Sequence, residues 1–214
     1  MVFPTTSWFV VYLVQTSGLS DSAIRDASSW ASANGLRPRE RAETEREFDH
    51  LLGQKQGYVS FAFESAPRYR TLDLYRFSAG PSGNHILGLD IDTYLLQGHR
   101  SRDANRRERA RSYLERILSF IEQVITLAKP RYGIGDRAES FSTDNKGNSL
   151  PPSEEEVIDL LLGSRQKPWL AYLGAPILPR VDEMQIRGAV GWRTQEIAGG
   201  RLIVTRANPV ELLA

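Results

Sequence analysis

Cysteine is absent from the sequence, and lysine is scarce: only four of the 27 basic residues are lysine. Without cysteine the chain can form no disulfide, no thiolate metal site and no cysteine nucleophile. This composition suits a reducing cytoplasm, which is the compartment that we expect. Because almost every basic residue is arginine, an arginine at any one position is weak evidence for a function there.

The sequence also lacks a long hydrophobic run. Residues 8–14, WFVVYLV, form the apolar run near the N-terminus, and a membrane-spanning helix needs about 20 such residues. No basic segment precedes this run, as a signal peptide would require. We therefore expect no contact with a membrane. The formal net charge of +1 means that only a local patch could attract a polyanion.

The sequence does have the length and patterning of a folded domain. Its 214 residues predict a single domain over residues 1–214, which can bury a large core without disulfides or metal. Alternation with a period of two, between short Gly, Pro, Ser and Asn connections, predicts a run of strands. These strands are expected at residues 8–15, 58–64, 71–78 and 85–96.

Helices separate the groups of strands. Apolar residues three and four apart, together with capping signals, predict helices at 20–35, 100–129 and 153–163, and a short solvated helix within 37–54. A strand at 132–136 and a hairpin that turns at Gly199-Gly200 complete the order β-α-(α)-β-β-β-α-β-α-β-β. This order predicts the α+β class, with a mainly antiparallel sheet and helices packed on it.

The densest positive charge lies in HRSRDANRRERARSYLERIL, residues 99–118, which holds seven arginines and no lysine. On a helix that turns about 100° per residue, these arginines fall on both flanks of an apolar stripe rather than on one face. Three carboxylates are interspersed among them. One interpretation is a nucleic-acid-binding surface that includes Arg102, Arg106 and Arg109. The other is the solvated flank of a core helix.

Asp90 and Asp92 stand two apart on a predicted strand, so their carboxylates point to the same face of the sheet. Clustered carboxylates can hold Mg²⁺ or Mn²⁺ for phosphodiester chemistry. Glu64 or Asp73, on neighbouring predicted strands, would have to lie close to them. The alternative interpretation is the solvated face of a half-buried sheet, because no lysine stands nearby in a position suited to a nuclease.

Signatures of a catalytic centre are missing from the sequence. It has no Gly-x-Ser-x-Gly elbow and no phosphate-binding glycine loop. His50, His85 and His99 stand at no metal-ligand spacing from one another. We therefore expect no cofactor, and a non-catalytic protein is the better hypothesis.

A second charged segment, residues 136–156, is acidic and rich in serine. An acidic loop beside a capped helix can dock against a basic partner. Solvation and helix capping are the competing explanation for the same charges. The interface candidates in this segment are Asp136, Glu139, Asp144 and Glu154.

Three stretches in the C-terminal part of the chain resemble the immunity-protein 52 family of bacterial polymorphic toxin systems. They are KPWLAYLGAPILP at 167–179, GGRLIVT at 199–205 and YGIGD at 132–136. The resemblance implies a single-domain, non-catalytic protein that inhibits a cognate toxin by occluding its site, with a nuclease of restriction-endonuclease fold as one such toxin. Trp169 and Tyr172 also have a sufficient explanation as core aromatics.

The leading hypothesis is an intracellular, immunity-like binding protein whose partner is a cognate toxin or another protein. The alternative is a nucleic-acid-binding or metal-dependent phosphodiesterase-like protein that uses the arginine-rich helix and the pair Asp90 and Asp92. Binding to nucleic acid would weaken steeply with salt. Binding of metal to the native state would raise the melting temperature.

Overall fold

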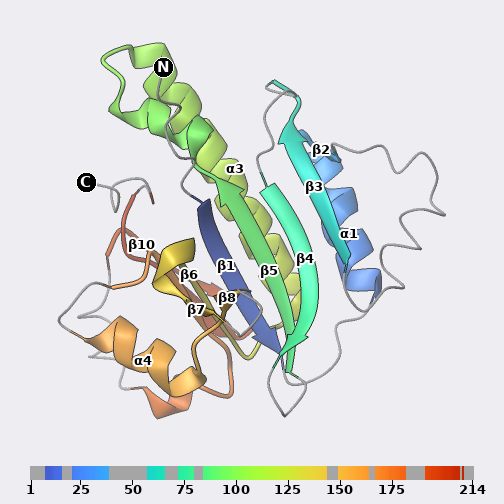
Figure 1. Ribbon diagram of the computed structural model, residues 1–214, viewed down its shortest axis with the longest axis vertical. Coiled ribbons are helices and arrows are strands. Elements are labelled where there is room, and N and C mark those ends of the chain that lie inside the picture. The colour runs from blue at the N-terminus through green and yellow to red at the C-terminus, as the bar shows by residue number, and fades with distance from the viewer. Residues whose placement is uncertain are drawn as a thin grey trace.

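The structure of the protein is a computed structural model. It describes residues 8–15, 21–38, 57–65, 72–79, 84–143, 149–163, 167–181, 191–207 and 209. Figure 1 shows one twisted sheet with helices against its two faces. This arrangement confirms the α+β class and the mainly antiparallel sheet.

The sheet combines strands from both halves of the chain. Its strands are β1 (Trp8–Gln15), β2 (Leu36–Pro38), β3 (Gly57–Phe63), β4 (Leu72–Ala79), β5 (Asn84–Asp92), β6 (Tyr132–Arg137), β9 (Leu170–Leu173), β10 (Arg193–Ile197) and β11 (Gly200–Val204). They follow the order β10-β11-β9-β6-β1-β5-β4-β3-β2, and neighbouring strands pair antiparallel. The short strands β7 (Ser142–Thr143) and β8 (Ser149–Leu150) form a separate ribbon.

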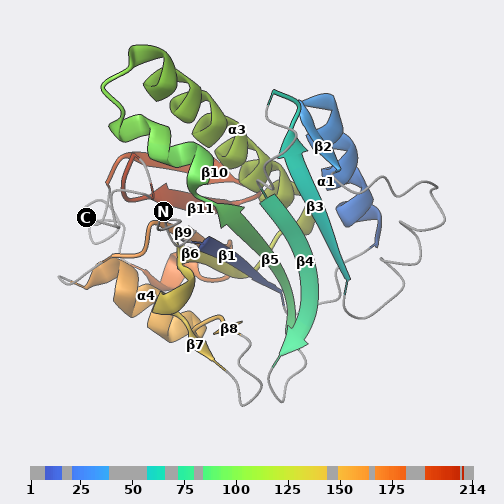
Figure 2. The ribbon, with the colours of Figure 1, turned by 45° about the horizontal axis from the view of Figure 1, so that its top comes forward.

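Two helices, α1 (Asp21–Ala33) and α3 (Ala104–Ala128), cover one face of the sheet, as Figure 2 shows. Phe9, Val11 and Leu13 of β1 point into the core on this side. Burying such side chains stabilises the fold by about 1.5–3 kcal/mol each. The buried residues of α3 are Ala110, Leu114, Ile117, Leu118, Phe120, Ile121, Val124 and Ile125.

The opposite face is covered by α4 (Glu154–Leu162) together with the short helices η2 (Ala138–Ser140) and η3 (Leu178–Arg180). Val10, Tyr12 and Val14 of β1 join this second core. Because β1 is buried on both faces, its sequence is a continuous apolar run rather than an alternating one. The aromatic residues Trp169 and Tyr172 of the C-terminal part are buried, as predicted.

The ends of the elements follow local signals, with one correction. Gly35 adopts φ +78° two residues after the end of α1, and Pro130 stands two residues after the end of α3. The C-terminal hairpin turns at Ala198 and Gly199, with φ 52° and 76°, rather than at Gly199-Gly200. Two successive residues with positive φ match the right-handed twist of a hairpin.

Two predicted boundaries were wrong at the junction before α3. The strand predicted at 85–96 ends at Asp92, and a short helix, η1 (Tyr94–Arg100), follows it. The helix predicted from residue 100 begins at Ala104. Of the short helix predicted within 37–54, residues 39–54 lie outside the described part. Within the described residues, no helix is both long and apolar enough to cross a membrane.

Candidate functional site

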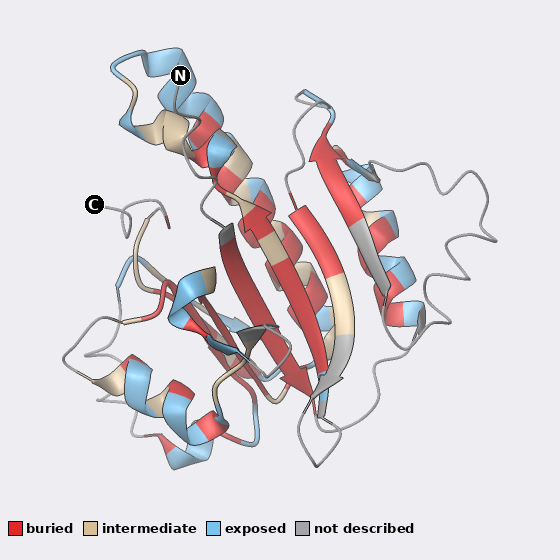
Figure 3. Cartoon of the chain, viewed as in Figure 1, coloured by how far each residue is buried: buried red, intermediate tan, exposed pale blue. Residues whose placement is uncertain are grey.

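The arginine-rich segment lies where η1 leads into α3. Figure 1 shows that this end of α3 extends beyond the end of the sheet, and Figure 3 shows that its surface is largely exposed. Residues 102–109 are all exposed. We call residues 94–111, which comprise η1 and the first turns of α3, the arginine knob.

Side-chain hydrogen bonds hold the turn of the arginine knob. The Asp103 carboxylate caps α3 by accepting from the Asn105 N–H at 2.8 Å. Nη1 of Arg107 donates to the carbonyl oxygens of Ser101 and Arg102, at 2.9 and 2.8 Å. These bonds join the end of η1 to the first turn of α3, so Arg107 has a structural role.

Close packing fixes η1 against α3. A Cβ at Gly98 would lie 3.0 Å from the carbonyl oxygen of Arg106 and 3.3 Å from the Cβ of Ala110. Glycine at this position therefore allows the two backbones to approach closely. Leu96 of η1 and its N-cap residue Thr93 are also buried. The arginine knob is thus a defined structural element and not an isolated helix end.

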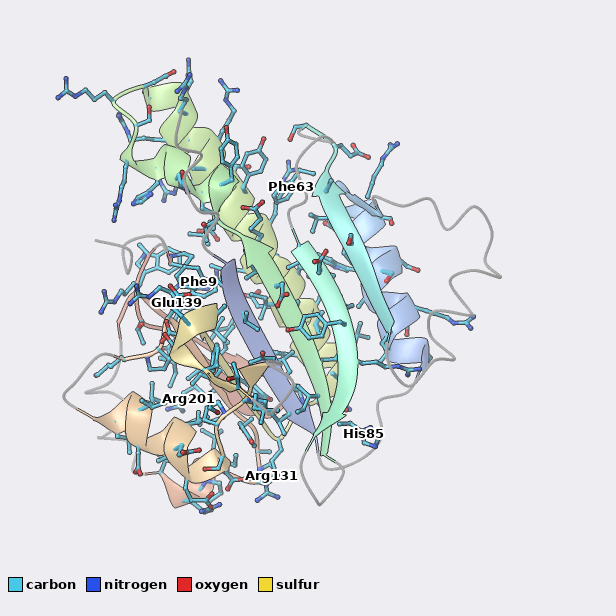
Figure 4. The ribbon with its side chains drawn as sticks, in the orientation of Figure 1. Phe9, Phe63, His85, Arg131, Glu139 and Arg201 are labelled. Atoms are coloured by element: carbon cyan, nitrogen blue, oxygen red, sulfur yellow. The ribbon has the colours of Figure 1, made fainter. Side chains whose placement is uncertain are left out.

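Most arginines of the knob have little pairing inside the protein. Arg106 lies 3.8 Å from Asp103, and both side chains are exposed, so this pair contributes little. Arg102, Arg109 and Arg111 have no carboxylate at salt-bridge distance within the described part of the chain. Figure 4 shows the nitrogen ends of side chains pointing outward around this end of α3.

The aspartates suggested as metal ligands lie at the base of the knob. The Asp92 carboxylate accepts from the N–H of Tyr94 at 2.8 Å, and Asp90 accepts from the Tyr75 hydroxyl at 2.8 Å. Asp73 stands opposite Asp90 in the strand register. No group of three or more described His, Cys, Asp or Glu residues is arranged to hold a metal ion. Tyr94 itself is 44% exposed.

The four acidic interface candidates occupy different environments. Asp136 is buried on β6, where burial raises the pKa of its carboxyl and the Arg137 N–H donates to it at 2.8 Å. Glu139 is exposed on η2, and Glu154 is buried at the start of α4. Asp144 lies outside the described residues. Of the four, only Glu139 is described as exposed.

Glu154 holds α4 to two other segments. Its carboxylate accepts from Arg131, beside the start of β6, and from Arg180 at the end of η3. The hydrogen bond from Arg131 lowers the pKa of Glu154. At the same helix end, the Ser153 hydroxyl accepts from the Glu156 N–H at 3.3 Å, and the Glu156 carboxylate accepts from the Ser153 N–H at 2.7 Å. The acidic first turn of α4 therefore stabilises the fold.

A groove of about 540 Å³ lies between α1 and α3, and Glu108 and Arg111 of the arginine knob form part of its lining. The Arg116 guanidinium at its wall lies 5.9 Å from the centre of the Phe63 ring, and Glu115 pairs with Arg193 at 3.4 Å. Arginines and glutamates both face the groove, so it has no single sign of charge. Its lining residues are Trp30, Asn34, Leu36, Glu108, Arg111, Ser112, Glu115, Arg116 and Ser119.

Sequence reasoning missed Tyr94 and the structural role of Arg107. Tyr94 was included in the strand predicted at 85–96, because the apolar pattern continues through Leu95 and Leu96. The signal that would have found the knob is Asp103, an N-cap residue directly before a helix-forming run. Such a cap places the start of α3 after Arg100, the last residue of η1, and after Arg102, which lies in the turn.

Comparisons with known proteins give no family. No protein-family model and no curated protein matches the sequence. Among solved structures, the Pseudomonas aeruginosa T6SS protein PA0821 is similar to this chain, with a TM-score of 0.46 and 11% sequence identity. The match covers 93% of this chain and 64% of that chain, so this chain spans less than two thirds of that protein's length. The resemblance to the immunity-protein 52 family stays a prediction.

Proposed function

We propose that the protein is a non-catalytic, immunity-like binding protein that inhibits a cognate toxin in the cytoplasm by occluding its surface. The observation that carries this proposal is the arginine knob, an exposed projection held by internal hydrogen bonds. A convex projection is suited to occlusion because it can enter a concave site on a partner.

The composition of the arginine knob supports binding to a protein. Arginine and tyrosine are enriched among the residues that contribute most to protein–protein affinity. The knob combines Tyr94 with the exposed arginines Arg102, Arg109 and Arg111. Because its turn is already ordered by Arg107, little backbone conformational entropy is lost when a partner binds.

The acidic residues have a smaller part in this proposal. Glu139 is exposed and can contact a partner. Asp144, which lies outside the described residues, stays a candidate predicted from the sequence. Glu154 would have to leave two arginines to contact a partner, and Asp136 would have to become exposed. We therefore place the principal contact at the arginine knob and not at the acidic segment.

A tagged pull-down from the source organism tests the proposal. The lysate is divided into a nuclease-treated and an untreated half, and each eluate is read by mass spectrometry and by absorbance at 260 nm. We expect a single protein partner in both halves, with one copy of the partner for each copy of this protein. An eluate that contains only nuclease-sensitive material would instead support the alternative that Arg102, Arg106 and Arg109 bind nucleic acid.

A growth assay then tests inhibition. The captured partner is expressed alone and together with this protein in a host that lacks both. We expect the partner alone to slow growth and co-expression to restore it. Normal growth with the partner alone would show that the partner is not a toxin. Turnover of a substrate by this protein alone would contradict the proposal that it is non-catalytic.

A further inference from the structure

We infer that the arginine knob docks into a carboxylate-lined cleft of the partner protein, an inference that rests on the binding function proposed above. Arg102, Arg109 and Arg111 are its charge contacts, and Tyr94 is its apolar anchor. The inference concerns the chemistry of the partner's surface, which the proposed function leaves open.

The placement of the arginines around the helix points to a cleft rather than a flat surface. Arg109 and Arg111 stand on either side of Ala110, which is buried against η1. Since successive helical residues are about 100° apart, these two side chains leave α3 in nearly opposite directions. A flat partner could contact only one of them at a time. A partner that receives the projecting end can contact both.

Charge complementarity identifies the lining of that cleft. Arg102, Arg109 and Arg111 are exposed and have no carboxylate at salt-bridge distance among the described residues. A guanidinium group binds a carboxylate through paired hydrogen bonds, which gives direction as well as attraction. Asp and Glu side chains of the partner are therefore the groups that these arginines recognise.

Tyr94 supplies an apolar contact at the base of the knob. It is 44% exposed at the start of η1, and its backbone is fixed by the hydrogen bond to Asp92. A tyrosine ring contributes a large contact area at a small cost in conformational entropy. The ring can pack against the rim of the cleft.

Other charges favour a protein over a nucleic acid as the occupant. The knob itself exposes two carboxylates, Asp103 and Glu108, and the whole chain has a formal net charge of only +1. A nucleic acid carries negative charge along its entire length and is held by many cations. A partner protein can place carboxylates opposite the arginines and leave Asp103 and Glu108 facing water or cations.

Site-specific photo-cross-linking in the source cells tests this inference. A benzophenone amino acid replaces Asn105, which is exposed within the arginine knob, in one variant. In the matched control it replaces Thr126, which is exposed near the other end of α3. After irradiation, the cross-linked species are isolated, and the partner peptides are identified by mass spectrometry.

We expect position 105, and not position 126, to cross-link to one protein, through a peptide that contains several Asp or Glu residues. A cross-link from position 105 to nucleic acid, or to a peptide without carboxylates, overturns the inference. A partner that cross-links only from position 126 also overturns it but leaves the binding function standing. No cross-link from either position, together with an empty pull-down, contradicts both.

A matched pair of charge variants tests the same inference through affinity. The knob variant is Arg109→Glu with Arg111→Glu, and the control is Arg25→Glu with Lys129→Glu, both exposed positions outside the knob. We expect the knob variant to bind the captured partner at least tenfold more weakly than the control. If the glutamate variant does not fold, Arg109→Gln with Arg111→Gln replaces it, and the same direction is expected. Equal affinities of the two variants overturn the inference.

Discussion

Two short, highly charged helix ends of the molecule differ in the partners of their side chains. They are the acidic start of α4 and the arginine knob of α3. At α4, Glu154 pairs with two arginines and Glu156 completes a capping box with Ser153. At the knob, Arg109 and Arg111 have no carboxylate at salt-bridge distance among the described residues. The first-turn carboxylates Glu154 and Glu156 of α4 hold the fold together, whereas Arg102, Arg109 and Arg111 of the knob are available to a partner.

The two helix ends show that a charged run indicates an interface only when its charged side chains have no partners within the fold. From the sequence, the acidic segment is the predicted protein interface, and the arginine-rich segment is predicted only as an alternative, nucleic-acid-binding surface. The structure separates them by burial: the Glu154 side chain is 9% exposed, while residues 102–109 are all exposed. A buried carboxylate with two partners is an expensive group to move to a binding surface.

The largest expected effect comes from reversing charges at the knob. Arg109→Glu with Arg111→Glu should weaken partner binding by about 100-fold, because losing well-formed interfacial charge pairs costs about 2–5 kcal/mol. The melting temperature should stay close to that of the wild type, because both side chains are exposed. Calorimetric titration and a thermal melt of the same sample measure the two quantities. A lower melting temperature with unchanged affinity would mean that Arg109 and Arg111 stabilise the fold and do not contact the partner.

Removing the carboxylate of Glu154 should lower stability and leave partner affinity unchanged, the reverse of the charge reversal at the knob. Glu154→Gln leaves Arg131 and Arg180 without their shared carboxylate. We expect the free energy of unfolding to fall by about 1–2 kcal/mol, less than for a fully buried pair because both arginines are partly exposed. Urea denaturation measures this loss, and partner affinity should not change. Asp159→Asn, an exposed acidic position on the same helix, is the control.

The pH dependence of the stability of Glu154→Gln gives a second test of the ion pairs at α4. The pKa of Glu154 is lowered in the folded protein, first by the hydrogen bond from Arg131. Its contribution is therefore fully present above the unfolded value of 4.5 and is lost as the pH falls through the lower, folded pKa. The difference in melting temperature between wild type and Glu154→Gln should be constant from about pH 7 to 5 and shrink below about pH 4.5. A difference that grows in acid would contradict the ion pairing.

The smallest effects are expected at the two helix caps. Ser153→Ala and Asp103→Ala should each cost about 1 kcal/mol of stability. Only Asp103→Ala should also weaken partner binding, by several-fold, because it loosens the turn that presents the arginines. Denaturation and titration of the two variants in parallel provide the measurement. If both caps affect binding equally, the distinction between the two helix ends fails.

The sequence predicts the fold well because most of its signals are local. The apolar run of β1, the spacing of buried residues along α3 and the capping box of α4 each lie within a few turns or a single strand. Periodicity cannot show that the first turns of α3 extend beyond the sheet. That depends on where the strands end, which is a property of the assembled fold.

The roles of the candidate site residues were harder to predict for the same reason. Glu154 is 23 residues from Arg131 and 26 from Arg180, so no local pattern reveals that they pair. Asp136 ends the strand predicted at 132–136, but no local pattern shows that its carboxylate is buried, as it is in β6 opposite Val10 of β1. Arginines 102, 106 and 109 were recognised as a group, but their exposure at a projecting end depends on η1, which the sequence did not indicate.

The central claim is that the arginine knob, and not α4, contacts the partner. Hydrogen–deuterium exchange of the protein with and without the captured partner tests it most directly. We predict that binding slows exchange in peptides covering residues 94–111 and leaves peptides covering residues 154–162 unchanged. Protection over 154–162 with none over 94–111 would contradict the account and return the interface to the acidic segment.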